Sequence, residues 1–252
     1  MTPSLHFLGT GAACTDAHRT TTMLAFHDAG SIIVIDCGGD LVQRLQQALL
    51  PLDQIAALIL THEHPDHVAG FPLMMQKLWL AGRRNPLPVH GIAPALAQAR
   101  KCFAAFDTSG WDGLPAIEWR EFPHAPGALV LNLGPWLVTA TPSLHGVPSV
   151  ALRVEHRPTG RVCVYSSDTA PSDDIARFAR GGHILIHEAS GSHAGHSTAL
   201  DAARIAAAAG VSALHLVHLP PEEQLDAAKM SAAREIFPQT FKAAELGKID
   251  LL

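Results

Sequence analysis

One short segment of this sequence constrains the fold more than any other. The apolar run 56–60 has the length and composition of a buried strand, and it leads almost directly into His62-Glu63-His64-Pro65-Asp66-His67. Three imidazoles and two carboxylates therefore follow the end of a buried strand within six residues. A single histidine there would usually belong to a solvated turn, but this many potential ligands together predict a metal site.

The spacing within this segment favours two metal ions. His62 and His64 are two positions apart and can converge on one ion from a loop. Asp66 and His67 begin the next predicted helix and can reach a second ion nearby. Two divalent ions about 3.5–4 Å apart polarise a substrate oxygen and generate hydroxide from water at neutral pH. The segment therefore predicts metal-dependent hydrolysis.

Strand-like and helix-like patterns alternate along the rest of the chain. Strands are expected at 5–8, 22–26, 32–35, 56–60, 87–91, 137–140, 150–155, 162–166, 184–187 and 213–217. Helices are expected at 40–50, within 68–80, and at 94–106, 172–180 and 198–209. Asp28-Ala29-Gly30 predicts a turn, and 107–134 predicts only short strands and turns. Since no linker divides the chain, we expect one α/β domain over residues 1–252.

Composition excludes several other classes of protein. Apolar residues make up 48% of the 252 residues and charged residues 16%, which is typical of a packed domain. The net charge of −5 provides no general attraction to nucleic acid. The four cysteines form no Cys-x-x-Cys pair, which argues against a zinc knuckle or a redox motif. Neither a signal-like segment nor an apolar run of about 18 residues is visible, so we expect no membrane insertion and a cytoplasmic location.

The histidine segment is similar to the signature of a known family. His62-x-His64-x-Asp66-His67 resembles the motif of the metallo-β-lactamase superfamily, whose fold is a four-layered αββα sandwich. The resemblance implies three further ligands, which match His145 in Leu144-His145-Gly146, Asp168 in Ser167-Asp168-Thr169 and His218 in Val217-His218-Leu219. It implies His62, His64 and His145 on one ion, Asp66, His67 and His218 on the other, and Asp168 bridging both. Zinc is expected from the histidine-rich set, with manganese or iron as alternatives.

His215 competes with His218 for the last ligand position. Side chains alternate along a strand, so residues three apart point to opposite faces and only one of the two can reach the metals. His218 follows the strand's carboxyl end, where the other ligands are expected, and is therefore preferred. His215 is then expected to be a core or helix-facing residue.

Four shorter strings resemble the ribonuclease Z-like branch of the superfamily. They are Phe7-Leu8-Gly9-Thr10-Gly11, Tyr165-Ser166-Ser167-Asp168-Thr169, Leu185-Ile186-His187-Glu188-Ala189 and Gly195-His196-Ser197-Thr198. The resemblance implies that His196 is a proton donor beside the scissile phosphate, which makes His196 and Asp66 the catalytic candidates. The alternative is that Ser197 caps the following helix and His196 is merely exposed beside it. His187 and Glu188 are expected to orient ligands, whereas His18, His27, His124, His183 and His193 are expected on the surface or in loops.

The resemblance does not extend to the transfer-RNA arm of true ribonuclease Z enzymes. That arm lies between the third histidine and the bridging aspartate, where this chain has only 23 positions, enough for a two-strand hairpin within 148–165. The missing arm and the acidic net charge argue against transfer-RNA processing, so a large nucleic acid is not the expected partner. We expect a phosphodiesterase acting on small phosphodiesters such as cyclic nucleotides.

Two alternatives remain open at this stage. The same metal pair can hydrolyse a carboxylic ester, lactone, thioester or sulfate ester, and residues 107–136 form either an apolar pocket wall for such a substrate or ordinary core. A non-catalytic metal-binding protein is less expected, because all seven ligand positions are filled. The apolar helix 71–80 is either core or a dimer face, and the resemblance implies a homodimer.

Overall fold

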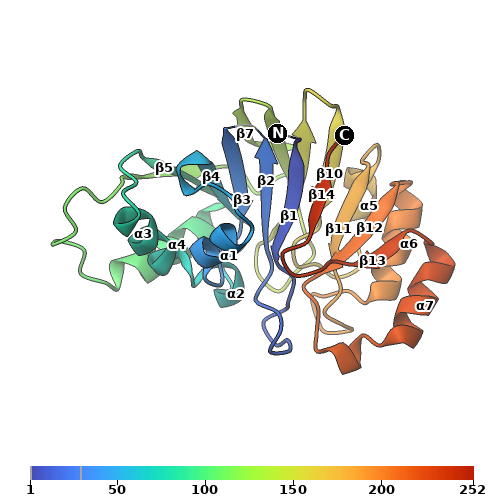
Figure 1. The fold of residues 1–252 in the computed structure, drawn as a ribbon. Helices are drawn as coiled ribbons and strands as arrows, with labels where there is room; N and C mark the ends of the chain where they lie inside the picture. The colour runs from blue at the N-terminus through green and yellow to red at the C-terminus, as the bar shows by residue number, and fades with distance from the viewer. Residues whose placement is uncertain (1, 29) are drawn as a thin grey trace.

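Two seven-stranded sheets lie face to face between two layers of helices in the computed structural model, which describes residues 2–28 and 30–252 (Figure 1). The first sheet has the order β14 (Lys248–Asp250), β1 (Ser4–Gly9), β2 (Met23–Asp28), β3 (Ser31–Ile35), β4 (Ile55–Leu60), β5 (Leu87–Gly91) and β6 (Ile117–Glu121). The second has the order β13 (Thr240–Lys242), β12 (Ala213–Val217), β11 (Ile184–Glu188), β10 (Arg161–Tyr165), β9 (Val150–His156), β8 (Trp136–Pro142) and β7 (Ala128–Leu133).

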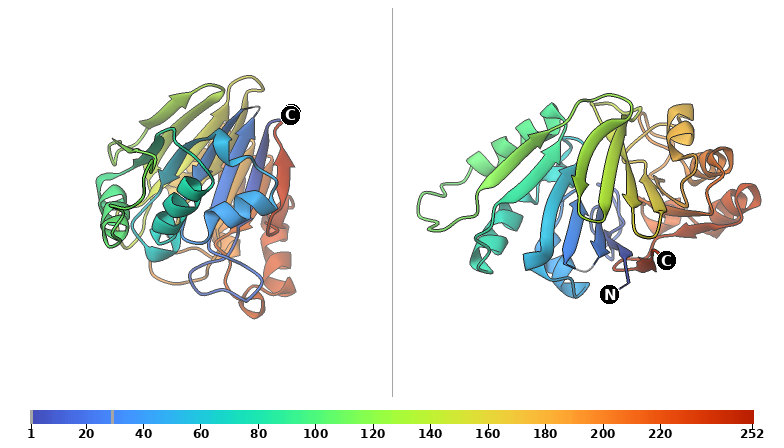
Figure 2. Two further views of the ribbon diagram at one scale, coloured as in Figure 1. Left: turned by 60° about the vertical axis from the view of Figure 1, so that its left-hand side comes forward. Right: turned by 90° about the horizontal axis from the view of Figure 1, so that it is seen from above.

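The helices divide between the two outer faces. The first sheet is covered by α1 (Leu41–Gln47), α2 (Pro65–Val68), α3 (Phe71–Leu80) and α4 (Ala93–Ala104), and the second by α5 (Asp173–Ala179), α6 (Ala199–Ala209) and α7 (Ala227–Ile236). Both views in Figure 2 show this order of layers. The four-layered αββα sandwich predicted from the family resemblance is therefore confirmed.

Both sheets combine antiparallel and parallel pairing in the same order. Strands β14-β1-β2-β3 and β7-β8-β9-β10 are antiparallel, and β3-β4-β5-β6 and β10-β11-β12-β13 are parallel. The parallel strands end at the same edge of the sandwich, which is where parallel sheets usually present ligand sites. The candidate site lies at this edge.

Two apolar clusters stabilise the sandwich. The larger lies between the sheets and beneath α1, α3 and α4, and the smaller is formed by α5, α6 and α7 on the outer face of the second sheet. The apolar positions of α3 contribute to the first cluster, because Phe71, Met74, Met75 and Leu78 are buried. Leu73 and Leu80 on the same helix are exposed, so the core prediction for this helix is confirmed and the dimer face stays a prediction.

Most predicted elements are present within one or two residues of their expected ends. The hairpin within 148–165 is confirmed as β9 and β10, which pair antiparallel. The predicted turn at Asp28-Ala29-Gly30 includes residue 29, which lies outside the described residues. The sequence reading missed α7, β13 and β14, and it located neither β6 nor β7 within 107–134. Across the described residues, no helix combines the length and apolar character that a membrane crossing needs.

Candidate metal centre

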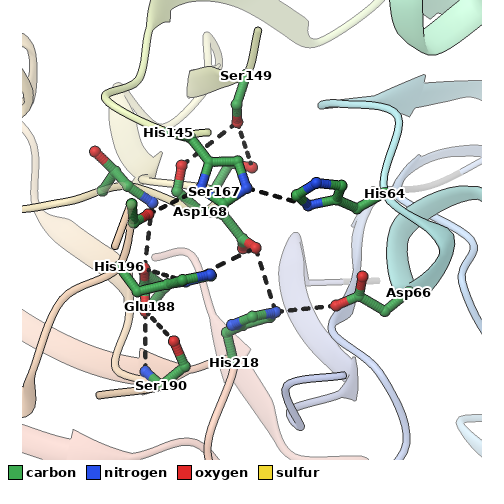
Figure 3. A network of polar contacts seen from close by, with 12 residues as sticks. His64, Asp66, His145, Ser149, Ser167, Asp168, Glu188, Ser190, His196 and His218 are labelled. Atoms are coloured by element: carbon green, nitrogen blue, oxygen red, sulfur yellow. Dashed lines mark hydrogen bonds and ion pairs between the residues drawn. The ribbon is translucent and has the colours of Figure 1, made fainter. Parts of the chain in front are cut away.

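The seven predicted ligands meet at the carboxyl ends of strands from both sheets. His62, His64, Asp66 and His67 follow β4, His145 follows β8, Asp168 follows β10 and His218 follows β12. Figure 3 shows His64 and Asp66 approaching from one side, with His145, Asp168 and His218 opposite them. The structure thus brings every one of these residues into one cluster.

The cluster separates into two groups that share one carboxylate. In each group, the candidate ligand atoms lie within 4.8 Å of one another: His62, His64, His145 and Asp168 in one, and Asp66, His67, His218 and Asp168 in the other. His64 Nδ1 lies 3.2 Å from His62 Nε2 and 3.1 Å from His145 Nε2. His218 Nε2 lies 3.2 Å from Asp66 Oδ2 and 3.4 Å from Asp168 Oδ2. This partition is the one that the family resemblance implied.

The second ring nitrogens of three histidines are held by protein oxygens. His67 Nδ1 donates to Asp36 Oδ2 at 2.9 Å, and His145 Nδ1 donates to the Gly195 carbonyl at 2.8 Å. His62 Nδ1 lies 3.1 Å from Thr61 Oγ1, which in turn donates to Asp36. With the proton at Nδ1, each Nε2 has a lone pair that points into the cluster, as metal-binding histidines require. The donor set therefore fits two divalent cations.

Buried polar atoms that lack partners lead to the same conclusion. Among the described residues, His67 Nε2 and Asp168 Oδ1 are buried without a hydrogen-bond partner, although they face each other at 3.5 Å. A buried polar atom without a partner costs free energy, and a cation between these two atoms would satisfy both. A dinuclear metal site is compatible with the whole His/Asp cluster.

The protonation equilibria of the cluster follow from its burial and charge. Burial holds the pKa of His62 well below its usual range, which favours the neutral imidazole that binds metals. Burial alone would favour the neutral acid at Asp168, but His218 and His67 hold its pKa well below the usual range. Burial would likewise lower the pKa of His67, yet Asp168 and Asp36 raise it well above the usual value. The ionised, buried carboxylates thus favour positive charge in the cluster, either as a proton on His67 or as a bound cation.

Asp36 was not identified from the sequence. It follows β3 with a φ of 61° and accepts from the Thr61 backbone N–H at 2.9 Å as well as from His67. The loop after β3 passes directly beneath the histidine turn, because a Cβ at Gly38 would lie 1.7 Å from the Asp66 carbonyl oxygen. Asp36 therefore fixes two histidines of the turn, and its only sequence signal is an acidic residue directly after a buried strand.

Glu188 holds His196 beside the cluster (Figure 3). Its buried carboxylate accepts from His196 Nδ1 at 2.9 Å and from the backbone N–H groups of Thr169, Ser190 and Ser197. The hydrogen bond to Glu188 raises the pKa of His196. The His196 ring stacks on His218 with 5.6 Å between centroids. Glu188 thus orients His196, which corrects the expectation that it orients a metal ligand.

The alternative explanation of the His196 segment is wrong in its details. Thr198, not Ser197, caps α6, in a reciprocal capping box with Asp201. Ser197 is buried and donates its hydroxyl to the Thr169 carbonyl at 2.7 Å. His196 is only partly exposed, with 19% of its side chain accessible. It is therefore a held residue at the site and not a free neighbour of a helix cap.

The remaining histidines lie away from the cluster or at its margin. His215 packs between Phe7 and Phe241, and burial lowers its pKa to about 4, as expected for a core position. His187 is buried, its Nδ1 donates to the Glu188 carbonyl at 2.7 Å, and among the described residues its Nε2 has no hydrogen-bond partner, so it orients no candidate ligand. His27 is buried within β2, which corrects its expected surface position. His193 is exposed beside His196, at the margin of the site.

The tryptophans of the region 107–136 pack against other aromatic rings. Trp111 stacks on Trp79, Trp119 packs on Phe71, and Trp136 packs on Phe26. Of the described residues, none from 107–136 lines either of the two cavities next to His193. The region therefore forms no apolar wall at these two cavities, although Pro126 and Gly127 line a third cavity together with Thr141 and Phe178.

Comparisons with known proteins agree with this geometry. The sequence model of the family described as Beta-lactamase superfamily domain matches residues 32–219, from β3 to just past His218. Ribonuclease Z of Methanopyrus kandleri is 33% identical, over 93% of this chain and 92% of that protein. The probable metallo-hydrolase YhfI of Bacillus subtilis is 28% identical, over 81% of this chain and 82% of that protein.

Solved structures show the same architecture. The crystal structure of YhfI, described as a metallo-beta-lactamase fold protein, superimposes with a TM-score of 0.83 at 23% identity and covers 99% of this chain and 100% of that chain. Human tRNase Z, short form, superimposes with a TM-score of 0.80 at 20% identity and covers 99% of both chains. At these identities the likeness supports the fold, and the family match rests on the sequence model.

Proposed function

Since this chain belongs to the beta-lactamase superfamily, we propose that it is a dinuclear metal-dependent phosphodiesterase acting on small phosphodiesters such as cyclic nucleotides. Family members include metal-dependent hydrolases, and the His/Asp cluster here is compatible with two ions. His62, His64 and His145 would hold one ion, Asp66, His67 and His218 the other, and Asp168 both. We propose zinc for both positions because the donor set is rich in imidazole.

The metal pair, when bound, supplies a Lewis acid for the phosphoryl oxygen and a water of lowered pKa as nucleophile. The chain's own residues hold this pair in place. Asp36 keeps the tautomers of His67 and His62 fixed, and the Gly195 carbonyl does the same for His145. Asp66 Oδ2 lies 3.5 Å from His67 Nε2 and 3.2 Å from His218 Nε2; burial alone would raise the pKa of Asp66, but these two histidines hold it well below the usual range, so its carboxylate stays ionised.

The observation that favours phosphodiesters is the way His196 is held. Its Nδ1 donates to Glu188, so its Nε2 is the ring atom free to carry a proton to substrate. The His196 ring is stacked on the ring of His218. It also meets the ring of His145 edge to face, with 5.0 Å between the centroids of His196 and His145. We propose that His196 Nε2 protonates the departing oxygen. An alkoxide leaving group depends on such an acid, which typically contributes about 10²–10⁴-fold.

Small substrates are proposed rather than transfer RNA. The hairpin of β9 and β10 fills the interval between His145 and Asp168, and the chain's net charge is −5. The matched relatives named Ribonuclease Z support the phosphodiester chemistry, whereas the short hairpin argues against the arm that a transfer RNA would require.

A leaving-group series tests this proposal. The zinc-loaded protein is assayed with aryl methyl phosphates whose leaving groups range from p-nitrophenol to phenol, and with p-nitrophenyl acetate as the carboxylic ester. We expect hydrolysis of the phosphodiesters, with His196→Ala reducing kcat/KM only slightly for p-nitrophenol and about a hundredfold for phenol. His18→Ala, at an exposed histidine outside the cluster, is the matched control.

Two outcomes would contradict the proposal in different ways. Turnover of the acetate without any phosphodiester cleavage would move the function to the carboxylic-ester class. A uniform loss across the whole leaving-group series in His196→Ala, with metal content unchanged, would show that His196 does not act as the acid.

A further inference from the structure

Two adjacent cavities lie between the candidate metal centre and α7. The inner cavity, of about 320 Å³, is lined by His196 and His218 and by Cys14 from the loop after β1. The outer cavity, of about 420 Å³, lies between the first turn of α6 and α7. Both are lined by Ser190, His193, Pro220 and Gln224, so they adjoin each other at these residues, and we call the two cavities together the path.

The lining of the outer cavity has a mixed character. Ala199, Leu200, Leu225 and Ala232 provide apolar walls. Neutral hydrogen-bonding side chains are contributed by Ser190, Ser192, Thr198 and Gln224. Ser190 and Thr198 already donate to Glu188 and Asp201, so a polar edge would be bound by Ser192 and Gln224. A flat group with apolar faces and a polar edge would fit this lining. The cavity volume is in the range of sites for small organic ligands.

The charged side chains that line the path further restrict the class of ligand that it can bind. Lys229 is the one side chain with a fixed charge among the described residues that line the two cavities, and none of those residues is acidic. Its Nζ donates to the Gln224 carbonyl at 2.6 Å, which directs the ammonium toward the cavity rim and leaves further donors free. A cationic group would be repelled here, whereas a carbonyl acceptor on a ring edge would be bound.

His193, which the sequence placed among loop histidines without a role, lines both cavities. Its ring is almost perpendicular to that of His196, with 6.4 Å between centroids and 85° between planes. Its backbone carbonyl accepts from the His196 N–H at 3.1 Å, so the exposed ring is anchored next to the candidate acid. An imidazole in this position offers a flat face to a group that enters the path.

From these observations, we infer that the path is a nucleoside subsite, in which one ester arm of the phosphodiester passes His193 and places its base between α6 and α7. The inference rests on the proposed phosphodiesterase function and specifies its substrate class. The base edge would accept from Lys229, and its faces would lie against Ala199, Leu200 and Ala232. His193, Lys229 and Ala232 then determine specificity without touching the metal ligands.

Two substrates with the same leaving group test this inference. Methyl p-nitrophenyl phosphate lacks a nucleoside, and thymidine 5′-(p-nitrophenyl phosphate) contains one. We expect the zinc-loaded protein to prefer the thymidine ester by at least tenfold in kcat/KM. Ala232→Phe fills the cavity and should abolish this preference, while Ala228→Phe, at an exposed position on the same helix, should preserve it. Lys229→Met removes one charged donor and should reduce the preference about threefold to tenfold.

The methyl ester separates failure of the inference from failure of the function. Cleavage of the methyl ester by all variants, with no preference for thymidine in the native protein, would overturn the nucleoside subsite and leave the phosphodiesterase intact. Cleavage of neither ester would overturn the function itself. An equal loss in Ala232→Phe and Ala228→Phe would show that the effect is not due to filling of the cavity.

Discussion

Two halves of the molecule contribute to the cluster in different ways: the first half builds β1 to β6, and the second builds β7 to β13. Their sheets have the same order of antiparallel and parallel pairing. In the first half, one turn after β4 provides four candidate ligands within six residues. In the second half, His145, Asp168 and His218 each follow a different strand and are spread over more than seventy positions. The candidate acid, His196, also comes from the second half.

Each half has one buried carboxylate that orients histidines. Asp36 of the first half binds His67 and, through Thr61, His62, which are both candidate ligands. Glu188 of the second half binds His196, a candidate acid. The first half is thus built to hold cations, and the second adds the bridging ligand, the acid and the cavity next to it.

The backbone at the junction of the halves is unusual in both. Asp36, Ser167 and His218 have positive φ angles of 61°, 50° and 52°. Such conformations in non-glycine residues cost about 1–3 kcal/mol each and persist where the surrounding structure holds them. Both halves therefore have strained backbone angles directly after their strands, at the point where their candidate ligands meet.

The largest expected effect follows from loss of the residue shared by both groups. Asp168→Ala should remove a ligand from both ions and the carboxylate that lies within 4.0 Å of ring nitrogens of His62, His67, His196 and His218. We expect kcat/KM to fall by on the order of a thousandfold or more, since a metal pair supplies several kcal/mol of transition-state stabilisation. Metal analysis should show fewer than two ions per chain. Asp173→Ala, at an exposed acid on α5, should change neither quantity.

Loss of Asp36 and loss of Glu188 should have different effects, because one carboxylate orients candidate metal ligands and the other orients the candidate acid. Asp36→Asn should weaken metal affinity by about 10–100-fold, because the tautomer of His67 is no longer fixed, and excess zinc should restore much of the activity. Glu188→Gln should retain both metals yet lose activity chiefly with poor leaving groups. Metal titration and the aryl methyl phosphate series measure the two effects. Equal metal loss in both variants would contradict the division of roles.

A smaller effect is expected where an ion pair joins loops of the two halves. Arg19, from the loop after β1, contacts Glu222, from the loop after β12, at 2.9 Å. Exposed pairs of this kind contribute about 0.2–1 kcal/mol, so Arg19→Met should lower Tm by only about 1–3 °C. Thermal unfolding measures it. A fall of 10 °C or more would mean that this pair, and not the shared core, holds the halves together.

At pH 7 the smallest expected effect comes from the titration of His215 in the second half, and it grows as the pH falls. Burial lowers its pKa to about 4, so it stays neutral in the folded protein while the unfolded chain takes up a proton below about pH 6.5. Its contribution to stability therefore decreases as pH falls from 6.5 toward 4. His215→Leu should reduce the loss of Tm between pH 7 and pH 5, whereas His18→Leu should not. Identical pH dependence in native protein and His215→Leu would contradict the assignment.

The two halves also differed in how far the sequence predicted them. The turn after β4 was predicted from its residues alone, because neighbours in sequence are there neighbours in space. No local spacing links His145, Asp168 and His218, so the family resemblance alone predicted them as ligands. The comparisons confirm that family. Asp36 was missed for the same reason: its partners lie 25 and 31 positions away.

The sequence did not predict those helices and strands whose local hydrophobic pattern is weak. The strands β13 and β14 have three residues each, and β14 pairs with β1 from the opposite end of the chain. Helix α7 buries only Met230 and Ala233, so it has little apolar periodicity. By contrast, β5 and β12 were predicted with the observed bounds because each is a short apolar run between turns. The four-layer order itself came from the resemblance rather than from periodicity.

Anomalous diffraction from crystals of the zinc-loaded protein tests the central claim most directly. We expect two zinc peaks about 3.5–4 Å apart, one among His62, His64 and His145 and one among Asp66, His67 and His218, with Asp168 reaching both. A single peak held by the first-half residues alone, or two peaks that Asp168 does not contact, would contradict the claim that both halves build one dinuclear centre.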